Sequence, residues 1–580
     1  MKEPSRASLI LYLRVFASRP RPASVATNRA GARLHITGRP IRVVHQQGET
    51  LVPREHEGSE PVRSSRMGDP LVVGISVGFV LLFLAASLFD MDAVARGIGE
   101  GFASTARLLG SYFQLLLLLT FVTALGLLFT PAAGARIGGL PQPEMSRFRW
   151  ISIILCTLLA GGGVFFAAGE PVYHFLVTPP SFTTEAGTAE AVAPALAQSF
   201  MHWGFLAWAI LGALTAIVLA HAHYSRGLPL RPRSLLVPVF GERAMRGAFG
   251  SLVDAICIIA VVAGTVGPIG FLATQMTFGL DELFGVGGGF GVQLTILGGL
   301  AALYVTSAVT GIHRGIQLLS RLNVLLVLAI GAVILVFGPT LFLVNSWFSG
   351  FGAYADSFLA MATQTAETAP DWWMQWWTVF FFAWFLGYGP LMAVFVARIS
   401  RGRTIREMIL AIAVIAPVAT TVWFTLLGGA GIHAQLHGVF DLTEALNDFR
   451  FDIATLTVAQ ALPGGLLMAV AVLLLTTLFV ATTGDSMSYS IAVVSTGHDD
   501  PLPGLRAFWG LAMALMAGVL LYMGEGQISV LQQFIVLTAI PVSLILLPSL
   551  WTGPRAAYAL AREQGLIAPL PGPGTARPPG

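Results

Sequence analysis

Long apolar runs alternate with short polar segments along most of this chain. The runs begin at Pro70 and end near residue 550. Each holds about 20 residues, the length that an α-helix needs to cross the hydrocarbon core of a bilayer. The pattern therefore predicts an all-α polytopic membrane protein with twelve transmembrane helices. The expected spans lie near 70–90, 111–131, 150–168, 194–222, 248–276, 289–309, 322–345, 374–399, 407–427, 462–492, 506–523 and 528–550.

The composition agrees with a membrane protein. Hydrophobic residues make up 55% of the chain and charged residues 11%, against about 25% charged residues in a soluble domain. A net charge of +3 gives no indication of a nucleic-acid partner. Cys156 and Cys257 lie inside apolar runs, so we expect no disulfide framework, metal cluster or cofactor. We find no Ser/His/Asp set, phosphate loop or HExxH that would support an intramembrane enzyme.

Positive charge is distributed unevenly among the loops. The loops after the second, fourth, sixth and eighth expected spans are rich in arginine, and the alternate loops are acidic or neutral. The positive-inside rule then places both termini in the cytoplasm, for a multi-pass protein of the inner (plasma) membrane. The arginines concerned are Arg136, Arg147, Arg149, Arg226, Arg231, Arg233, Arg243, Arg246, Arg314, Arg321, Arg401, Arg403 and Arg406.

The eighth expected span carries an aromatic ladder. Phe381, Trp384, Phe385 and Tyr388 recur at i, i+3, i+4 and i+7, so they share one helix face. The segment Gly387–Pro390 follows, and it predicts a break in the helix because proline cannot donate to the preceding turn. Broken backbone at membrane depth is tolerated where it lines a cavity, and rings beside it suggest a site for a cation with an apolar shell. The alternative is core or lipid-facing aromatics with a simple proline kink.

The end of this span also resembles a known family. The run ARISRGRTIRE, residues 397–407, is similar to the signature helix of the betaine/choline/carnitine transporter family, and the resemblance extends over about 70–553. It implies a leucine-transporter-type fold with two inverted five-helix repeats, spans 3–7 and spans 8–12. The family usually shows four tryptophans in this helix, and only one remains here, which leaves the substrate open. The matching positions are Phe382, Trp384, Phe385 and Tyr388.

The third and fourth spans supply the other expected parts of a substrate site. The third span is interrupted by glycines, five spans before the break expected in the eighth, as inverted repeats would give. Free amides of a half-helix beginning near Gly161 and Gly162 could bind a carboxylate. In the fourth span, the resemblance makes Trp203 and Trp208 aromatic walls of the central site. Glu170 is an ionisable residue near a span, for which we expect a structural or gating role.

The resemblance also implies a sodium site in the tenth span. Thr482 and Thr483 would supply hydroxyl oxygens, and the backbone carbonyls of Phe479, Cys156 and Leu159 would complete the coordination. The alternative is that the threonine hydroxyls bond to their own helix.

Two further expectations concern ions and gating. A second sodium site of some members would fall on Val261 and Thr265, where one hydroxyl is missing, so we expect it to be weak or absent. Asp485 could pair with Arg398 at the cytoplasmic mouth and close the pathway in one state.

Three regions are expected along the chain. Residues 1–66 form an arginine-rich, disordered extension, with translation from Met67 as an alternative; 67–553 form the transporter; and 554–580 form a short Pro/Gly-rich cytoplasmic tail. Because that tail carries only three arginines, we expect little osmotic regulation.

The expected function follows from the resemblance. It is a sodium-coupled importer of a zwitterion of the glycine betaine, choline, carnitine or dimethylsulfoniopropionate class, working by alternating access among membrane lipids. Family members are often trimers, which implies a homotrimer here. Sodium-independent exchange and proton coupling remain alternatives, with a non-transporting membrane sensor as a remote one.

Overall fold

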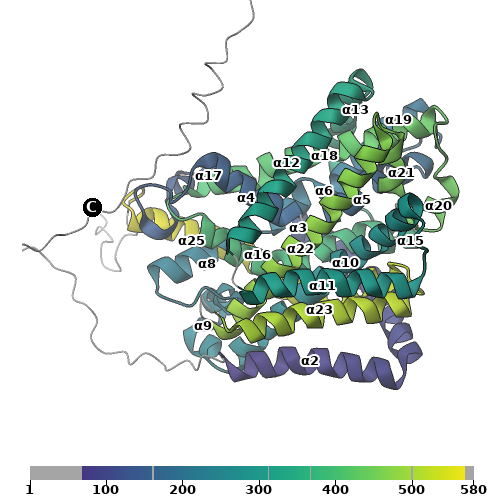
Figure 1. Ribbon diagram of the computed structural model, residues 1–580. Helices are drawn as coiled ribbons and strands as arrows, with labels where there is room; N and C mark the ends of the chain where they lie inside the picture. The colour runs from purple at the N-terminus through teal and green to yellow at the C-terminus, as the bar shows by residue number, and fades with distance from the viewer. Residues whose placement is uncertain (1–67, 160–161, 311–312, 366, 498–500, 569–580) are drawn as a thin grey trace, which may run out of the picture. The chain divides into compact units, whose positions relative to one another are not determined.

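The computed structural model describes residues 68–159, 162–310, 313–365, 367–497 and 501–568, which all belong to one compact unit. The regular elements of these residues are all helices, and no strand is present among them; a single isolated bridge joins Arg136 and Thr404. The chain is therefore an all-α polytopic membrane protein, as the apolar runs predict (Figure 1).

Ten helices in the described residues are long and apolar enough to cross a membrane, or eleven if the bent pair Arg321–Phe337 and Thr340–Asp356 counts as one span. The third expected span falls on α4 (Arg147–Leu159) and α5 (Gly162–Leu176), which are too short to be counted separately. The interruption expected at residues 160–163 falls partly on residues 160–161, which lie outside the described residues. The ten are α2 (Pro70–Phe89), α3 (Met91–Leu128), η3 to η4 (Ala189–Ser225), α10 (Ala248–Phe284), α11 (Phe290–Thr310), α15 to α16 (Asp371–Ile399), α17 to α19 (Ile405–Leu436), α22 (Gly465–Thr496), α23 (Pro503–Met523) and α24 (Ser529–Leu546).

Burial separates the central helices from the peripheral ones. In the segment Ala189–Ser225, 94% of the most apolar window is buried, whereas in α2 the share is 28%. Figure 1 shows α11 lying along α23, with α2 beside them, while α5, α6 (Val192–Trp203), α10 and α16 (Phe380–Ile399) lie further inside. Helix α2 is thus largely exposed on the surface of the described chain, whereas the central helices are packed on all sides.

The fourth expected span is not one continuous helix. Gly204, with φ −99° and ψ −137°, separates α6 from α7 (Phe205–Ile210). A Cβ at Gly204 would collide with the carbonyl oxygen of Phe200, so only glycine fits this close approach. The apolar pattern of this span carries no sign of the break.

The break expected at Gly387–Pro390 is wrong. Helix α16 runs through this segment without interruption, with Pro390 inside it. Gly389 serves close packing instead, because a Cβ there would lie 2.9 Å from Leu546 Cδ1 and 3.3 Å from the Ile210 carbonyl oxygen. The irregular turn of this span lies earlier, in the π-helical segment η6 (Met374–Val379).

The C-terminal region differs from the expected boundary at residue 554. Helix α25 (Ser549–Glu563) crosses that boundary and packs against α8 (Thr215–Ala220) and η1 (Pro131–Gly134). Its alanines and Leu560 supply an apolar face, which explains why a segment with Pro554 in its first turns remains helical. The remaining helices are η2 (Ile137–Gly139), η5 (Pro232–Leu235), α9 (Val237–Arg246), α12 (His313–Phe337), α13 (Thr340–Asp356), α14 (Phe358–Ala362), η7 (Ala411–Ile415), α18 (Ala416–Phe424), η8 (Thr425–Gly429), α20 (Thr443–Asn447) and α21 (Phe451–Ala461).

Candidate substrate and ion sites

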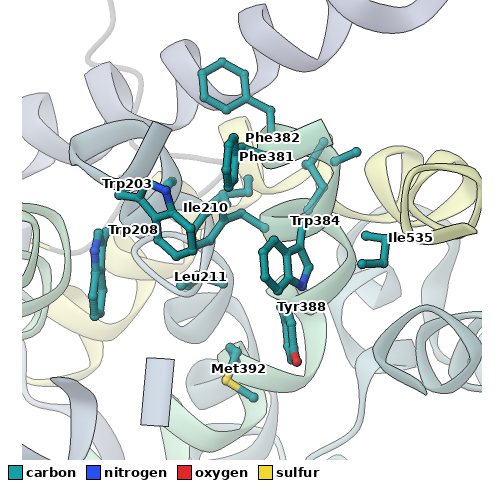
Figure 2. Packing of buried hydrophobic residues seen from close by; sticks show 14 of the residues in the cluster. Trp203, Trp208, Ile210, Leu211, Phe381, Phe382, Trp384, Tyr388, Met392 and Ile535 are labelled. Carbon is teal, nitrogen blue, oxygen red and sulfur yellow. The ribbon is translucent and has the colours of Figure 1, made fainter. Parts of the chain in front are cut away.

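Four aromatic rings from two helices meet at the centre of the protein. Trp203 ends α6, and its ring centroid lies 5.2 Å from Phe381, 6.0 Å from Trp384 and 5.6 Å from Phe385 of α16. The last three belong to the ladder expected on one face of α16. We call these four residues the aromatic box (Figure 2). The angles of 63° to 84° between Trp203 and these rings are those of edge-to-face packing, and a cation is attracted to the faces of such rings.

The first residue of α5 lies against this box. A Cβ at Gly162 would collide with the Cη2 atom of Trp384 and lie 3.0 Å from the Cη2 atom of Trp203. Gly162, the first described residue of α5, therefore lies beside the two indoles. Gly161, the other residue expected to bind a carboxylate, lies outside the described residues.

Helix α10 fixes the far side of the ladder. The indole Nε1 of Trp384 donates to the Gly264 carbonyl oxygen at 3.1 Å, and the Tyr388 hydroxyl donates to Thr265 Oγ1 at 3.3 Å. The Thr265 hydroxyl in turn donates to the Val261 carbonyl oxygen at 2.7 Å. The role of Gly264 could not be predicted from the sequence, because a backbone carbonyl acceptor does not depend on the type of side chain. Thr265, expected only as part of a weak second ion site, is here a partner of Tyr388.

Two expected members of the site lie elsewhere. Trp208 donates its indole N–H to Thr420 Oγ1 of α18 at 3.0 Å, and within the described residues no ring contact joins it to the aromatic box. Phe382 points away from Trp384 (Figure 2) and meets the ring of His202 at 6.5 Å. Gly204 changes the helix phase between Trp203 and Trp208, and successive residues such as Phe381 and Phe382 face directions about 100° apart.

A buried acid–histidine cluster lies behind Trp203. Glu170 Oε2 accepts the indole N–H of Trp203 at 2.6 Å, and Oε1 lies 2.7 Å from His202 Nδ1 and 3.4 Å from His174 Nε2. All three titratable side chains are fully buried. Glu170 was expected near the outer end of its span in a structural or gating role. The structure places it in direct contact with the aromatic box.

The same cluster has the residue types of a metal site. One ligand atom from each of Glu170, His174 and His202 lies within 4.8 Å of the others. Two ligands of a tetrahedral zinc ion with bonds of about 2.1 Å are separated by roughly 3.4 Å. The 2.7 Å between Glu170 Oε1 and His202 Nδ1 is instead the length of a charge-assisted hydrogen bond. We therefore interpret the contacts of Glu170 with His202 and Trp203 as hydrogen bonds. His174 lies beside them at 3.4 Å, and its ring nitrogens form no hydrogen bond among the described residues.

The residues expected to bind sodium lie on α22 and at the end of α4. Cys156 and Leu159 belong to the last turn of α4, and Phe479 precedes the threonine pair on α22. The Thr482 hydroxyl lies 2.8 Å from the Leu478 carbonyl oxygen and 3.1 Å from that of Phe479, as in the alternative of bonding within the helix.

The two threonines have different surroundings. Asn323 of α12 donates its side-chain amide to Thr482 at 3.2 Å, a partner that the sequence did not reveal. Thr483 is buried beside it. Sodium coordination by this set stays a prediction.

Asp485 has a cation beside it. The guanidinium of Arg506 on α23 lies 3.6 Å from its carboxylate and 5.2 Å from the ring centroid of Tyr489. Arg398 lies exposed in the last turn of α16. The gating pair of Arg398 and Asp485 stays a prediction.

Comparisons with known proteins agree with the resemblance in the signature helix. The family model described as BCCT, betaine/carnitine/choline family transporter, matches residues 71–562. Glycine betaine transporter 2 of Vibrio parahaemolyticus is 47% identical over 496 residues, which cover 86% of this chain and 91% of that protein. Glycine betaine transporter OpuD of Bacillus subtilis is 32% identical, over 76% of this chain and 84% of that protein. The betaine/ectoine transporter LcoP of Corynebacterium glutamicum is also 32% identical, over 83% of this chain and 76% of that protein.

Proposed function

The chain belongs to the betaine/carnitine/choline transporter family, and we propose that it is a secondary active transporter that imports a betaine-like zwitterion by alternating access. One observation carries the proposal. The indoles of Trp203 and Trp384 meet at Gly162, the first described residue of α5. The proposed cation site and the proposed anion site would therefore be adjacent, which suits the two ends of a small zwitterion.

The energetics suit such a ligand. A quaternary ammonium over an aromatic face gains about 0.5–2 kcal/mol per ring, and more when desolvated. The aromatic box offers four rings at the buried centre of the protein. The amides at the start of α5 favour a carboxylate, because the helix dipole places positive partial charge there. Neither half of the site alone distinguishes a betaine from a simple cation or a simple acid, but the pair does.

Sodium is the proposed coupling ion. It would be held by the hydroxyls of Thr482 and Thr483 and by backbone carbonyls of Phe479, Cys156 and Leu159. The family membership supports this set, and the pairing of a broken helix with adjacent hydroxyls is typical of transporter ion sites. No resident cofactor is proposed.

The setting in the cell is also a proposal. Arginine-rich loops on one side of the spans support a plasma-membrane protein with both termini in the cytoplasm. Exposed apolar side chains on α2, such as Leu81 and Leu82, would contact lipid. A homotrimer is proposed from the family alone.

Uptake of labelled glycine betaine, in a bacterial strain without betaine carriers, tests the function. Cells that express the protein should accumulate the label, and sodium replacement should abolish uptake. Competition by choline, carnitine, dimethylsulfoniopropionate and ectoine then ranks substrates. Absence of uptake and of binding for every member of this set would overturn the proposal. Uptake that persists without sodium would overturn the coupling alone.

A further inference from the structure

Glu170 contacts the aromatic box from behind, where no substrate atom is expected. Its carboxylate accepts a hydrogen bond from the N–H of Trp203 at 2.6 Å. Only the ring of Trp203 therefore lies between Glu170 and the proposed cation. We propose that Glu170 is a positioning residue that holds Trp203 and supplies the fixed negative charge by which the site selects a cationic head over a neutral one of the same shape. This inference rests on the proposed function.

The hydrogen bonds indicate an ionised carboxylate. With the Gln198 amide as oriented in the structure, its Nε2 lies 3.0 Å from His202 Nε2 and donates to it. His202 then carries its proton on Nδ1 and donates that proton to Glu170 Oε1 at 2.7 Å. Trp203 can only donate, so both oxygens of Glu170 accept. His202 is neutral in this arrangement, and Glu170 and His202 together carry a net charge of −1.

This charge has no strong counter-charge nearby. Among the described residues, the ion-pair partners of Glu170 are His174 and His202, and none is an arginine or lysine. Tyr173, the other titratable neighbour on α5, meets the ring of His174 at 5.7 Å. An uncompensated buried charge is costly, so a cationic ligand in the adjacent box would be favoured over a neutral one.

The surrounding rings keep the charge from being screened. Trp377 and Trp373 pack against His174 with centroid distances of 4.5 Å and 5.1 Å, and Trp377 and Phe381 stack on His202 at 6.0 Å and 4.9 Å. In such a water-poor environment a charge acts over a longer distance than in water.

Trp203 transmits the charge to the site. Its indole N–H points to Glu170, while its ring contacts Trp384 and Phe385. Donation to an anion makes the indole richer in electrons, and cation–π attraction grows with the negative potential of the ring face. Glu170 therefore acts both directly, through its charge, and through the ring of Trp203.

A pair of ligands of equal shape tests the inference. Glycine betaine and 3,3-dimethylbutyrate share a carboxylate and three methyl groups, and they differ in a quaternary nitrogen against a quaternary carbon. Binding of both to the purified protein should show a preference for glycine betaine. Glu170→Gln, which keeps size and an acceptor for Trp203, should reduce that preference roughly tenfold, the order expected for charges about 10 Å apart at an effective dielectric of about 20. It should not lower the affinity for 3,3-dimethylbutyrate, because the charge of Glu170 repels the carboxylate of that ligand and has no cationic head to attract.

Two further variants separate charge from structure. Glu170→Asp keeps the charge and should keep most of the preference. Trp203→Phe removes the N–H donor but keeps a ring and Glu170, and it should lower the preference severalfold even if Glu170→Gln does not fold. An unchanged preference for glycine betaine in Glu170→Gln, or an equal loss of affinity for both ligands, would overturn the inference. If Glu170→Gln does not fold, an unchanged preference in Trp203→Phe would overturn it. Wild-type protein that binds no quaternary zwitterion would instead overturn the proposed function.

Discussion

Trp384 donates its indole N–H to the backbone carbonyl oxygen of Gly264 across 3.1 Å. The two residues belong to α16 and α10, so this bond ties the ladder helix to the helix that faces it. Gly264 allows the approach, since a Cβ there would lie 3.1 Å from the ring of Tyr388. The plane of the Trp384 ring is thereby fixed before any ligand arrives, and a preorganised ring loses little entropy on binding.

Removing this ring should weaken substrate binding. Trp384→Ala and Phe385→Ala should each cost about 1–3 kcal/mol of binding free energy, from lost apolar contact and lost cation–π attraction. Glycine betaine affinity of the purified variants checks this. Trp384→Phe and Trp208→Phe form a matched pair of variants. Trp208→Phe is the control, because Trp208 contacts Thr420 and not the aromatic box. Unchanged affinity in both alanine variants would contradict the assignment.

The two threonines of α22 should differ in their effect on sodium. Thr483→Ala should raise the sodium concentration for half-maximal uptake, because it removes a proposed ligand, while Thr483→Ser should retain the hydroxyl and the wild-type value. Thr482→Ala should also disturb the contact with Asn323. Sodium titration of betaine uptake measures these changes. Equal sodium dependence in Thr483→Ala and wild type would remove Thr483 from the site.

Local periodicity accounts for what the sequence could predict. The ladder of Phe381, Trp384 and Phe385 lies on one helix face because the 3.6-residue period depends only on nearby residues. The apolar runs fixed the helical class in the same way, since length and composition alone decide whether a helix can cross a bilayer.

The features that the sequence could not predict depend on contacts between residues that are far apart in the chain. Gly204 ends α6 inside an apolar run, and that single break separates Trp203 from Trp208. The same reasoning failed in the opposite direction at Pro390, where α16 continues. The role of Glu170 depends on Trp203, 33 positions away on another helix. Sequence spacing gives no measure of such contacts.

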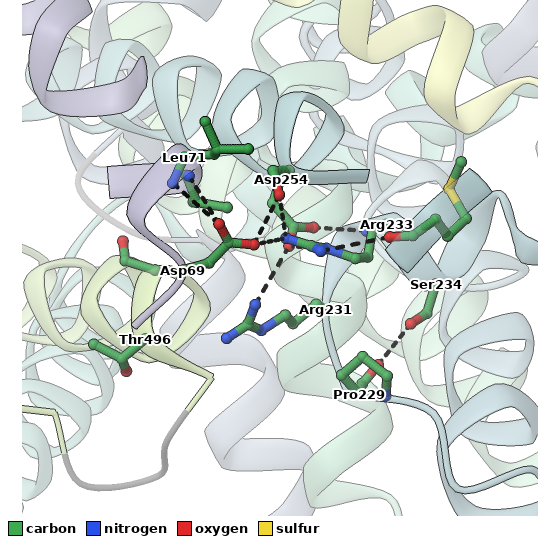
Figure 3. Close-up of polar contacts among 12 residues, drawn as sticks. Asp69, Leu71, Pro229, Arg231, Arg233, Ser234, Asp254 and Thr496 are labelled. Atoms are coloured by element: carbon green, nitrogen blue, oxygen red, sulfur yellow. Dashed lines mark hydrogen bonds and ion pairs between the residues drawn. The ribbon is translucent and has the colours of Figure 1, made fainter. Parts of the chain in front are cut away.

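A buried charge network at the start of α2 predicts a large effect on stability. Arg233 donates to Asp254 at 2.6 Å and to Asp69 at 2.7 Å, and Asp69 caps the N-terminus of α2 (Figure 3). Asp254 is fully buried. Arg233→Ala would leave a buried carboxylate without its main partner, at a cost of about 3–5 kcal/mol. Arg226→Ala, which breaks the exposed pair with Glu242, should cost at most about 1 kcal/mol.

Thermal unfolding of the detergent-solubilised protein distinguishes these two variants. The Arg233 variant should unfold at a clearly lower temperature, and the Arg226 variant close to wild type. Similar decreases of the unfolding temperature in both variants would mean that the buried pair of Arg233 and Asp254 does not control stability.

The same network predicts a dependence of stability on acid pH. Burial raises the pKa of Asp69, but hydrogen bonds from Arg233 and Ser251 and the charge of Arg233 outweigh it, so the pKa of Asp69 is lowered. A carboxyl group with a lowered pKa stabilises the fold above its unfolded pKa, about 3.9, and this contribution is lost as pH falls through the folded value. Unfolding temperatures measured between pH 7 and pH 3 should fall less steeply in Asp69→Asn than in wild type. Parallel curves would show that Asp69 does not contribute.

The C-terminal helix should tolerate one truncation and not another. The apolar face of α25 is buried through Leu560, Glu563 lies 2.9 Å from His221, and Gln564 exchanges two 2.7 Å hydrogen bonds with the backbone of Arg136. Deleting residues 569–580 leaves all these contacts, whereas deleting 556–580 removes them and exposes the apolar surface that α25 covers on α8 and η1.

We therefore expect the shorter deletion to keep wild-type expression, unfolding temperature and betaine uptake. The longer deletion should lower the unfolding temperature and the amount of protein in the membrane, because buried apolar area contributes about 25 cal/mol per Å². Uptake should be divided by the amount of protein, so that loss of stability is not mistaken for loss of transport. Leu560→Ala in the full chain gives an independent measure, at about 2–5 kcal/mol if the residue is as tightly packed as its burial indicates. If the longer deletion and Leu560→Ala both leave stability and uptake unchanged, α25 does not support the transporter.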